Sequence, residues 1–133
     1  MAEAQTRILV IDDEPLVRRA VVRSLEKEHE VVAVGTAAEA LRRLEHGEHF
    51  DLILCDLMMP EMTGMEMAAR LAESLPLMAA RMVFLSGGAF TRESAEFLGA
   101  MGSRFVEKPF LPEELCRRVA ELLTSVAGNQ RET

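Results

Sequence analysis

The sequence contains neither tryptophan nor tyrosine, and it has only two cysteines, Cys55 and Cys116. Cys55 lies inside an apolar run and Cys116 in a helical pattern, far apart and without the spacing of metal ligands. We therefore expect two packing residues in a reducing compartment, with no disulfide framework and no zinc site.

Long apolar runs are also missing. No stretch approaches the ~18 consecutive apolar residues that a membrane-spanning helix requires. The N-terminal residues Met-Ala-Glu-Ala-Gln-Thr lack the basic and apolar regions of a secretory signal. We expect a cytoplasmic protein that does not associate with a membrane.

Positive charge is scarce, with 15 Lys and Arg residues against 22 Asp and Glu residues and a net charge of −7. This balance disfavours binding to phosphate backbones, so we expect no direct contact with nucleic acid. Arginine pairs at positions 18/19, 42/43 and 117/118 stand among acidic residues, which indicates solvated helix faces. The length of 133 residues predicts one domain, with a core over about 7–127 and a flexible tail at 128–133.

Apolar runs rich in β-branched residues alternate five times with amphipathic segments, which is typical of a parallel sheet with helices on both faces. The predicted strands cover residues 7–12, 30–34, 51–56, 81–86 and 103–106. The predicted helices start at Pro15 and Thr36 and cover 64–74, 91–98 and 112–127, the last with Gly128 as its C-cap. The fold class is therefore α/β with a five-stranded parallel sheet.

Polar residues gather where four of the predicted strands end. Asp12 and Asp13 close the first strand, Asp56 the third and Ser86 the fourth, while Lys108 shortly follows the fifth. In open parallel sheets the ligand site lies beyond the carboxyl ends of the strands, so we expect these side chains to converge. The second strand has no such group, as expected of the edge strand in the order 2-1-3-4-5.

Three carboxylates at one end of a sheet raise one another's pKa unless a cation neutralises them. Oxygen ligands with one or two direct carboxylates favour Mg²⁺ over zinc, which prefers His or Cys. We therefore interpret Asp12 and Asp13 as cation-binding residues. The turn Asp-Asp-Glu-Pro would repel a pyrophosphate and lacks the glycines that a dinucleotide site needs. These features argue against a dinucleotide-binding fold.

Taken together, these residues resemble the receiver domain of two-component response regulators over about residues 7–126. The resemblance is carried by Asp12-Asp13, by Asp56 within LILCDLMMPEMTG, by Ser86 after MVFL and by Lys108-Pro109-Phe110. It implies a flavodoxin-like (βα)₅ three-layer sandwich and a phosphorelay signalling protein that is not an enzyme. The implied partners are a histidine kinase or histidine phosphotransfer protein and a downstream protein target.

The resemblance also implies a role for each site residue. Asp56 would accept the phosphoryl group. Asp13, Asp56 and the Met58 carbonyl would bind Mg²⁺ directly, and Asp12 would act largely through water. Lys108 would pair with the phosphoryl oxygens.

A conformational switch is implied as well. Ser86 would turn its hydroxyl to the phosphoryl group, and Phe105 would swing inward behind it, changing the surface of the fourth helix, fifth strand and fifth helix. Gly87 would leave room for this movement, and Pro109 would follow a cis peptide bond that aims the preceding lysine. Because a phenyl ring has no hydroxyl, we expect Phe105 to favour the buried position even before phosphorylation.

Two other functions are compatible with the sequence. One is a receiver-like docking module that works without phosphorylation. The other is a Mg²⁺-dependent aspartyl phosphatase of the haloacid dehalogenase type, although the first strand ends in adjacent acids and has no DxD. The Ser-Gly-Gly-Ala-Phe run at 86–90 is similar to receivers of hybrid histidine kinases, and we expect a monomer or weak dimer.

Overall fold

The computed structural model describes residues 5–87, 91–102 and 104–131 and contains a five-stranded parallel sheet in the order β2-β1-β3-β4-β5. The strands are β1 (Arg7–Ile11), β2 (Glu30–Val34), β3 (Leu52–Asp56), β4 (Met82–Ser86) and β5 (Phe105–Glu107). The helices are α1 (Pro15–Leu25), α2 (Ala37–Glu45), α3 (Gly64–Ser74), α4 (Pro76–Ala79), α5 (Arg92–Met101) and α6 (Pro112–Arg131). The predicted flavodoxin-like fold and strand order are confirmed.

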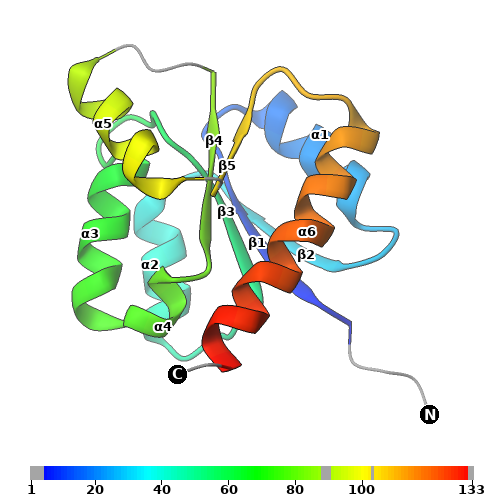
Figure 1. Ribbon diagram of the computed structural model, residues 1–133, viewed down its shortest axis with the longest axis horizontal. Coiled ribbons are helices and arrows are strands. Elements are labelled where there is room, and N and C mark those ends of the chain that lie inside the picture. Colours follow the sequence, from blue (N-terminus) through cyan, green and yellow to red (C-terminus); the bar gives the residue numbers. More distant parts are fainter. Residues whose placement is uncertain (1–4, 88–90, 103, 132–133) are drawn as a thin grey trace.

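Helices cover both faces of the sheet, with α1 and α6 on one face and α2, α3 and α5 on the other (Figure 1). Alternate residues of each central strand face the two layers. In β1, Leu9 and Ile11 belong to the core cluster under α2 and α3, whereas Ile8 and Val10 belong to the cluster under α1 and α6. Because both faces are buried from Ile8 to Ile11, this part of the strand is continuously apolar, as central parallel strands are.

Threonine side chains cap the starts of three helices. At α3, Thr63 Oγ1 accepts the Glu66 N–H at 3.1 Å, and the Glu66 carboxylate accepts the Thr63 N–H at 2.9 Å. At α2, the Glu39 N–H donates to Thr36 Oγ1 at 3.2 Å. Each bond satisfies a backbone N–H that has no partner inside the helix, so these residues define where the helices begin.

The last helix and the last strand differ from the prediction. The helix does not end at 127: α6 continues through Gly128 to Arg131, so the predicted helix end and the predicted C-cap at Gly128 are wrong. The flexibility of the tail stays a prediction. A glycine lowers helix stability by about 1 kcal/mol, which a helix anchored by buried residues such as Val126 tolerates. Strand β5 begins at Phe105, while the predicted start at Ser103 lies outside the described residues. So do residues 88–90 of the Ser-Gly-Gly-Ala-Phe run and residues 132–133.

Both cysteines are packing residues, as predicted. Cys55 is completely buried in β3, and burial raises the pKa of its thiol. Cys116 is half-buried in α6, where its thiol donates to the Ser24 carbonyl at 3.1 Å. Across the described residues, no helix combines the length and apolar character needed to cross a bilayer.

Candidate functional site

Asp12 and Asp13 lie at the carboxyl end of β1, where the chain turns into α1. Asp12 is completely buried, and its Oδ1 accepts the Glu14 backbone N–H at 2.9 Å, a contact typical of Asp in turns. Pro15 then starts α1 with a φ angle suited to a first helical turn. From that helix, Arg18 Nη1 donates to the Asp12 carbonyl oxygen at 2.7 Å. The loop that carries both acids is therefore fixed by hydrogen bonds to the side chain and to the backbone carbonyl of Asp12.

The role of Arg18 was not predicted from the sequence. Each of the three predicted arginine pairs has one exposed and one half-buried member, and Arg18 is the half-buried member of the first pair. Its guanidinium passes close to Gly35, where a Cβ would lie 3.2 Å from Nη1. Gly35 directly follows the edge strand β2, and this glycine was the sequence signal that could have predicted the close approach of Arg18.

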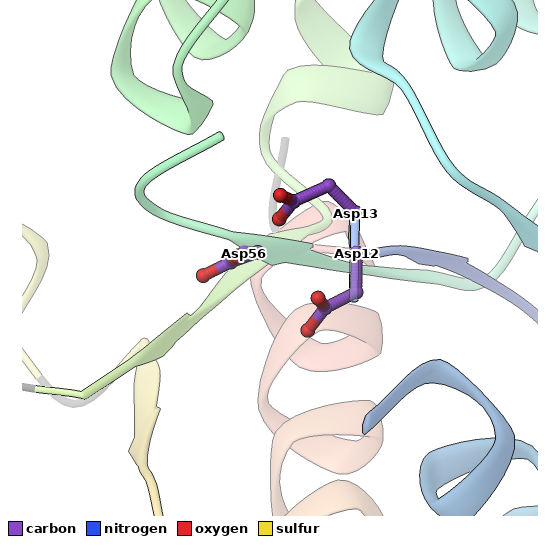
Figure 2. Close-up of side chains that lie close together, drawn as sticks. All are labelled: Asp12, Asp13 and Asp56. Atoms are coloured by element: carbon purple, nitrogen blue, oxygen red, sulfur yellow. The ribbon is translucent and has the colours of Figure 1, made fainter. Parts of the chain in front are cut away.

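Asp56 is the last residue of β3 and is 6% exposed. Its carboxylate lies beside those of Asp12 and Asp13 (Figure 2), and one ligand oxygen from each acid can be chosen so that all three lie within 4.8 Å of one another. Asp13 is the most exposed of the three, so the cluster opens to solvent on its side. The structure thus brings together the three acids that follow two neighbouring strands.

Lys108 places a single ammonium group against this cluster. Its Nζ lies 3.1 Å from Asp12 Oδ2 and 3.4 Å from Asp56 Oδ1. The backbone positions it, because the Lys108 N–H donates to the Ser86 carbonyl at 2.7 Å. The peptide bond between Lys108 and Pro109 is cis. Ser86, at the end of β4, is only 2% exposed. All four strand ends named by the sequence therefore meet at one edge of the sheet.

The charges in the cluster are incompletely balanced. Burial, followed by the charge of Asp12, raises the pKa of Asp56 to about 6 even though Lys108 acts in the opposite direction. Burial lowers the pKa of Lys108, but the charge of Asp56 and the hydrogen bond to Asp12 outweigh it, so the net shift is upward. The lysine therefore stays protonated, and the site has negative charge left over for a further cation.

Three further residues were predicted to belong to the site. Met58 lies in the loop after β3 with its side chain 43% exposed, and its carbonyl as a metal ligand stays a prediction. Gly87 is exposed, and a Cβ there would find open space. Phe105 is half-buried and packs against the core cluster that contains Phe84. The role of Phe105 in switching and its preference for the buried position stay predictions.

Gly64 is a second residue whose importance was missed. It starts α3, and its N–H donates to the Leu57 carbonyl at 2.9 Å. A Cβ at this position would lie 2.6 Å from the Asp56 carbonyl oxygen and 3.1 Å from the Leu57 Cα. Only glycine therefore lets α3 approach the backbone of the residue at the centre of the cluster.

We expect Gly64→Ala to lower the free energy of unfolding by about 2–3 kcal/mol, because backbone atoms have to move to admit the methyl group. Urea denaturation followed by circular dichroism measures this. The matched control is Gly99→Ala in α5, where a Cβ meets no heavy atom within 4 Å. The control is expected to gain up to about 1 kcal/mol from helix propensity. Equal effects of the two substitutions would contradict the close-approach explanation.

The donor set of the cluster fits a hard divalent cation. It consists of carboxylate oxygens without His or Cys side chains, which suits Mg²⁺ rather than zinc. The half-buried, positively charged Lys108 on the same cluster adds a partner for a tetrahedral oxyanion. The arrangement can therefore assemble a cation, an anionic group and a carboxylate nucleophile within a few ångströms.

A flavodoxin-like sheet whose carboxyl edge carries three clustered acids and a paired lysine is consistent with a signalling module that accepts phosphoryl groups. Residues 8–120 match the model of the response regulator receiver domain family, and the chain belongs to this family. Receiver domains bind Mg²⁺ at such a pocket and interact with histidine kinases or phosphotransfer proteins.

Individual relatives agree with this assignment. The chain is 32% identical over 118 residues to the response regulator receiver protein CpdR of Brucella abortus, covering 88% of this chain and 96% of CpdR. It is 32% identical over 126 residues to the protein PetR of Rhodobacter capsulatus, covering 95% of this chain but only 52% of PetR. The CheY-like receiver domain structure from Methanospirillum hungatei superposes with a TM-score of 0.81 at 29% identity, covering 95% of this chain and 99% of that chain.

Proposed function

We propose that Asp56 accepts a phosphoryl group from a phosphohistidine on a partner histidine kinase or histidine phosphotransfer protein. The observation that carries this proposal is the position of Asp56, buried beside two further acids and 3.4 Å from the Lys108 ammonium. Family membership supports it, because receiver domains are signalling modules that accept phosphoryl groups from such donors.

In the proposed step, an Asp56 carboxylate oxygen attacks the phosphorus of the donor phosphohistidine. A P–O bond forms and the P–N bond breaks, and the imidazole leaves with its electron pair and takes up a proton from solvent. Lys108 is placed to pair with the phosphoryl oxygens as they arrive. Because the loose transition state needs positioning and charge neutralisation, the carboxylate requires little further activation.

Asp13 and Asp56, with the Met58 carbonyl, would hold Mg²⁺, and Asp12 would act largely through water. When bound, the cation neutralises the carboxylates and the phosphoryl oxygens and aligns them for in-line transfer. Asp12 also keeps its contact with Lys108 at 3.1 Å, so the lysine is oriented before the donor arrives.

The phosphorylated state would be relayed through Ser86 and Phe105. Adding a dianionic group next to Ser86 favours a conformation in which its hydroxyl donates to the phosphoryl oxygens, and Phe105 follows into the core. The altered surface is that of α5, β5 and α6, which correspond to the fourth helix, fifth strand and fifth helix predicted from the sequence. A downstream protein would read this surface.

Intact mass spectrometry after incubation with Mg²⁺ and acetyl phosphate tests the proposal. We expect a gain of one phosphoryl group, located by peptide mapping on the segment that contains Asp56, and no gain when EDTA replaces Mg²⁺. Absence of phosphorylation in the presence of Mg²⁺ would instead support a docking module that works without it. Sustained turnover of a phosphate ester such as p-nitrophenyl phosphate would support the phosphatase alternative.

A further inference from the structure

A groove with an apolar floor and an acidic rim runs between α3 and α5, and its lining includes none of the three clustered aspartates. These two helices lie on the same face of the sheet (Figure 1). The groove is lined by Met65, Glu66, Ala68, Ala69, Glu93, Glu96, Phe97 and Met101. Every charged side chain in this lining is a glutamate, and no lining residue belongs to the proposed phosphoryl-transfer site.

The floor of the groove is apolar and is supported by the core. Met65, Ala68, Phe97 and Met101 are partly buried and pack against the core cluster on this face of the sheet. The Phe97 ring meets Phe84 of β4 edge to face, with centroids 4.9 Å apart. One wall is therefore held by an aromatic contact, while the two methionines supply flexible, polarisable surface that adapts to different ligands.

The hollow arises because small residues line it on the α3 side. Ala68 and Ala69 present only methyl groups, whereas a larger side chain at either position would fill the space between the helices. Helix α5 adds little cover, because Ser94 is its one completely buried side chain. Apolar surface that a monomer could bury thus remains partly open to solvent.

The rim carries negative charge that the protein does not neutralise. Glu66, Glu93 and Glu96 are all exposed. Within the described part of the chain, neither Glu93 nor Glu96 forms an ion pair, and Glu66 accepts only the Thr63 backbone N–H of the helix cap. An incoming ligand that brings positive charge would therefore find the Glu93 and Glu96 carboxylates without an ion-pair partner among the described residues.

We propose that this groove binds an amphipathic helix of a partner protein, with its apolar face on the floor and lysine or arginine residues against the glutamate rim. A helix fits because the groove lies between two helices, where a third can pack its ridge of side chains. Basic flanking residues fit because they complement the three glutamates and the net charge of −7. A second copy of this chain does not fit, because two-fold pairing would place the same acidic rims against each other.

The proposal does not require phosphoryl transfer, although the groove shares α5 with the surface that is proposed to change on phosphorylation. It is tested with a fluorescently labelled synthetic peptide of 18 residues that carries leucines on one helical face and lysines beside them. A second peptide has glutamate at every lysine position. Binding to the full chain is measured by fluorescence anisotropy. We expect the lysine peptide to bind and the glutamate peptide not to bind.

Location is tested with matched charge variants. The double variant Glu93→Gln/Glu96→Gln is expected to weaken binding of the lysine peptide about fivefold. The control Glu26→Gln/Glu45→Gln removes the same charge from exposed positions outside the groove and is expected to change affinity less than twofold. Equal weakening by both double variants would show attraction to net charge alone and overturn the proposal.

Methyl NMR gives a readout that does not depend on the charge variants. With ¹³C-methyl methionine labelling, the peptide is expected to shift Met65 and Met101, which line the groove. Met58, exposed beside the phosphoryl-transfer site, is the internal control and is expected not to move. Shifts at Met58 without shifts at Met65 and Met101 would place the peptide elsewhere and reject the groove as its site. The same experiment on Asp56→Asn separates this result from any failure of phosphorylation.

Discussion

Replacing Asp56 with asparagine is expected to abolish phosphoryl acceptance and at the same time to stabilise the folded protein in Mg²⁺-free buffer. The first effect follows because an amide offers no anionic oxygen to attack phosphorus. The second follows because the carboxylate is 6% exposed and faces Asp12, so its charged form is unfavourable in the fold. We expect a gain of about 3 kcal/mol at neutral pH, because the pKa of Asp56 is raised by about two units and each unit corresponds to about 1.4 kcal/mol.

The pH dependence of stability separates this explanation from a general packing effect. The pKa of Asp56 is about 6 in the folded protein and about 4 in an unfolded chain. The folded state therefore binds this proton more tightly, and the stability that it contributes is present below about pH 4 and is lost as the pH rises through about 6. The gain from Asp56→Asn should accordingly be largest above about pH 6 and vanish near pH 4.

Urea denaturation of both proteins across this pH range, with EDTA, measures the difference. Mg²⁺ should then stabilise the wild type more than the variant, because it binds the folded state and needs the Asp56 carboxylate. A variant less stable than the wild type at neutral pH would contradict the electrostatic description of the site. Phosphorylation of the variant would contradict the assignment of the acceptor.

Removal of the Lys108 ammonium is expected to have the opposite effect on stability. Lys108→Met leaves two buried carboxylates without their cation, one of them on the fully buried Asp12. Breaking a buried ion pair from one side costs about 3–5 kcal/mol, and we expect the lower end because Lys108 is 16% exposed. Phosphorylation by acetyl phosphate should slow by about 100-fold or more, because the phosphoryl oxygens lose a fixed positive charge.

A double-mutant cycle tests whether Lys108 acts through this cluster. Asp56→Asn should stabilise the Lys108→Met background more than it stabilises the wild type, because the carboxylate there has lost its neighbouring cation. Lys27→Met, which removes an exposed lysine after α1, is the control and should change stability by less than about 0.5 kcal/mol. Strict additivity in the cycle would indicate that Lys108 stabilises the fold by packing alone.

The sheet and the acidic edge could be predicted because their signals are local in the sequence. Strands β3 and β4 are buried on both faces and are therefore continuous apolar runs, and in parallel strands the residues at the run ends must meet at one edge. This rule predicted that Asp12, Asp56 and Lys108 lie close together, although Asp12 and Lys108 are 96 positions apart in the sequence. No knowledge of side-chain packing was needed for that step.

The missed features depend on contacts that no local pattern encodes. Helix α4 has only four residues, too few for a helical period to emerge. The sequence predicted that Arg18 lies on a solvated helix face. Its hydrogen bond to the Asp12 carbonyl joins α1 to the preceding loop, and this contact exists only in the folded structure. Gly64 looked like an ordinary helix start, because its close approach to the Asp56 carbonyl is set by how α3 docks on the loop after β3.

The end of the last helix was also difficult to predict from the sequence. The glycine at 128 suggested a C-cap, yet the backbone of α6 continues for three residues beyond it. Neighbouring methionines also have different environments in the structure, because Met67 is completely buried whereas Met65 lines the groove beside α5.

The sheet separates two hydrophobic clusters, one under α2, α3 and α5 and the other under α1 and α6. Substitutions in one cluster do not share neighbours with substitutions in the other, so their effects on stability should add. The packing beneath one face can therefore change without loosening the packing beneath the other, so the helices of one face could be redesigned while the opposite face keeps its stability.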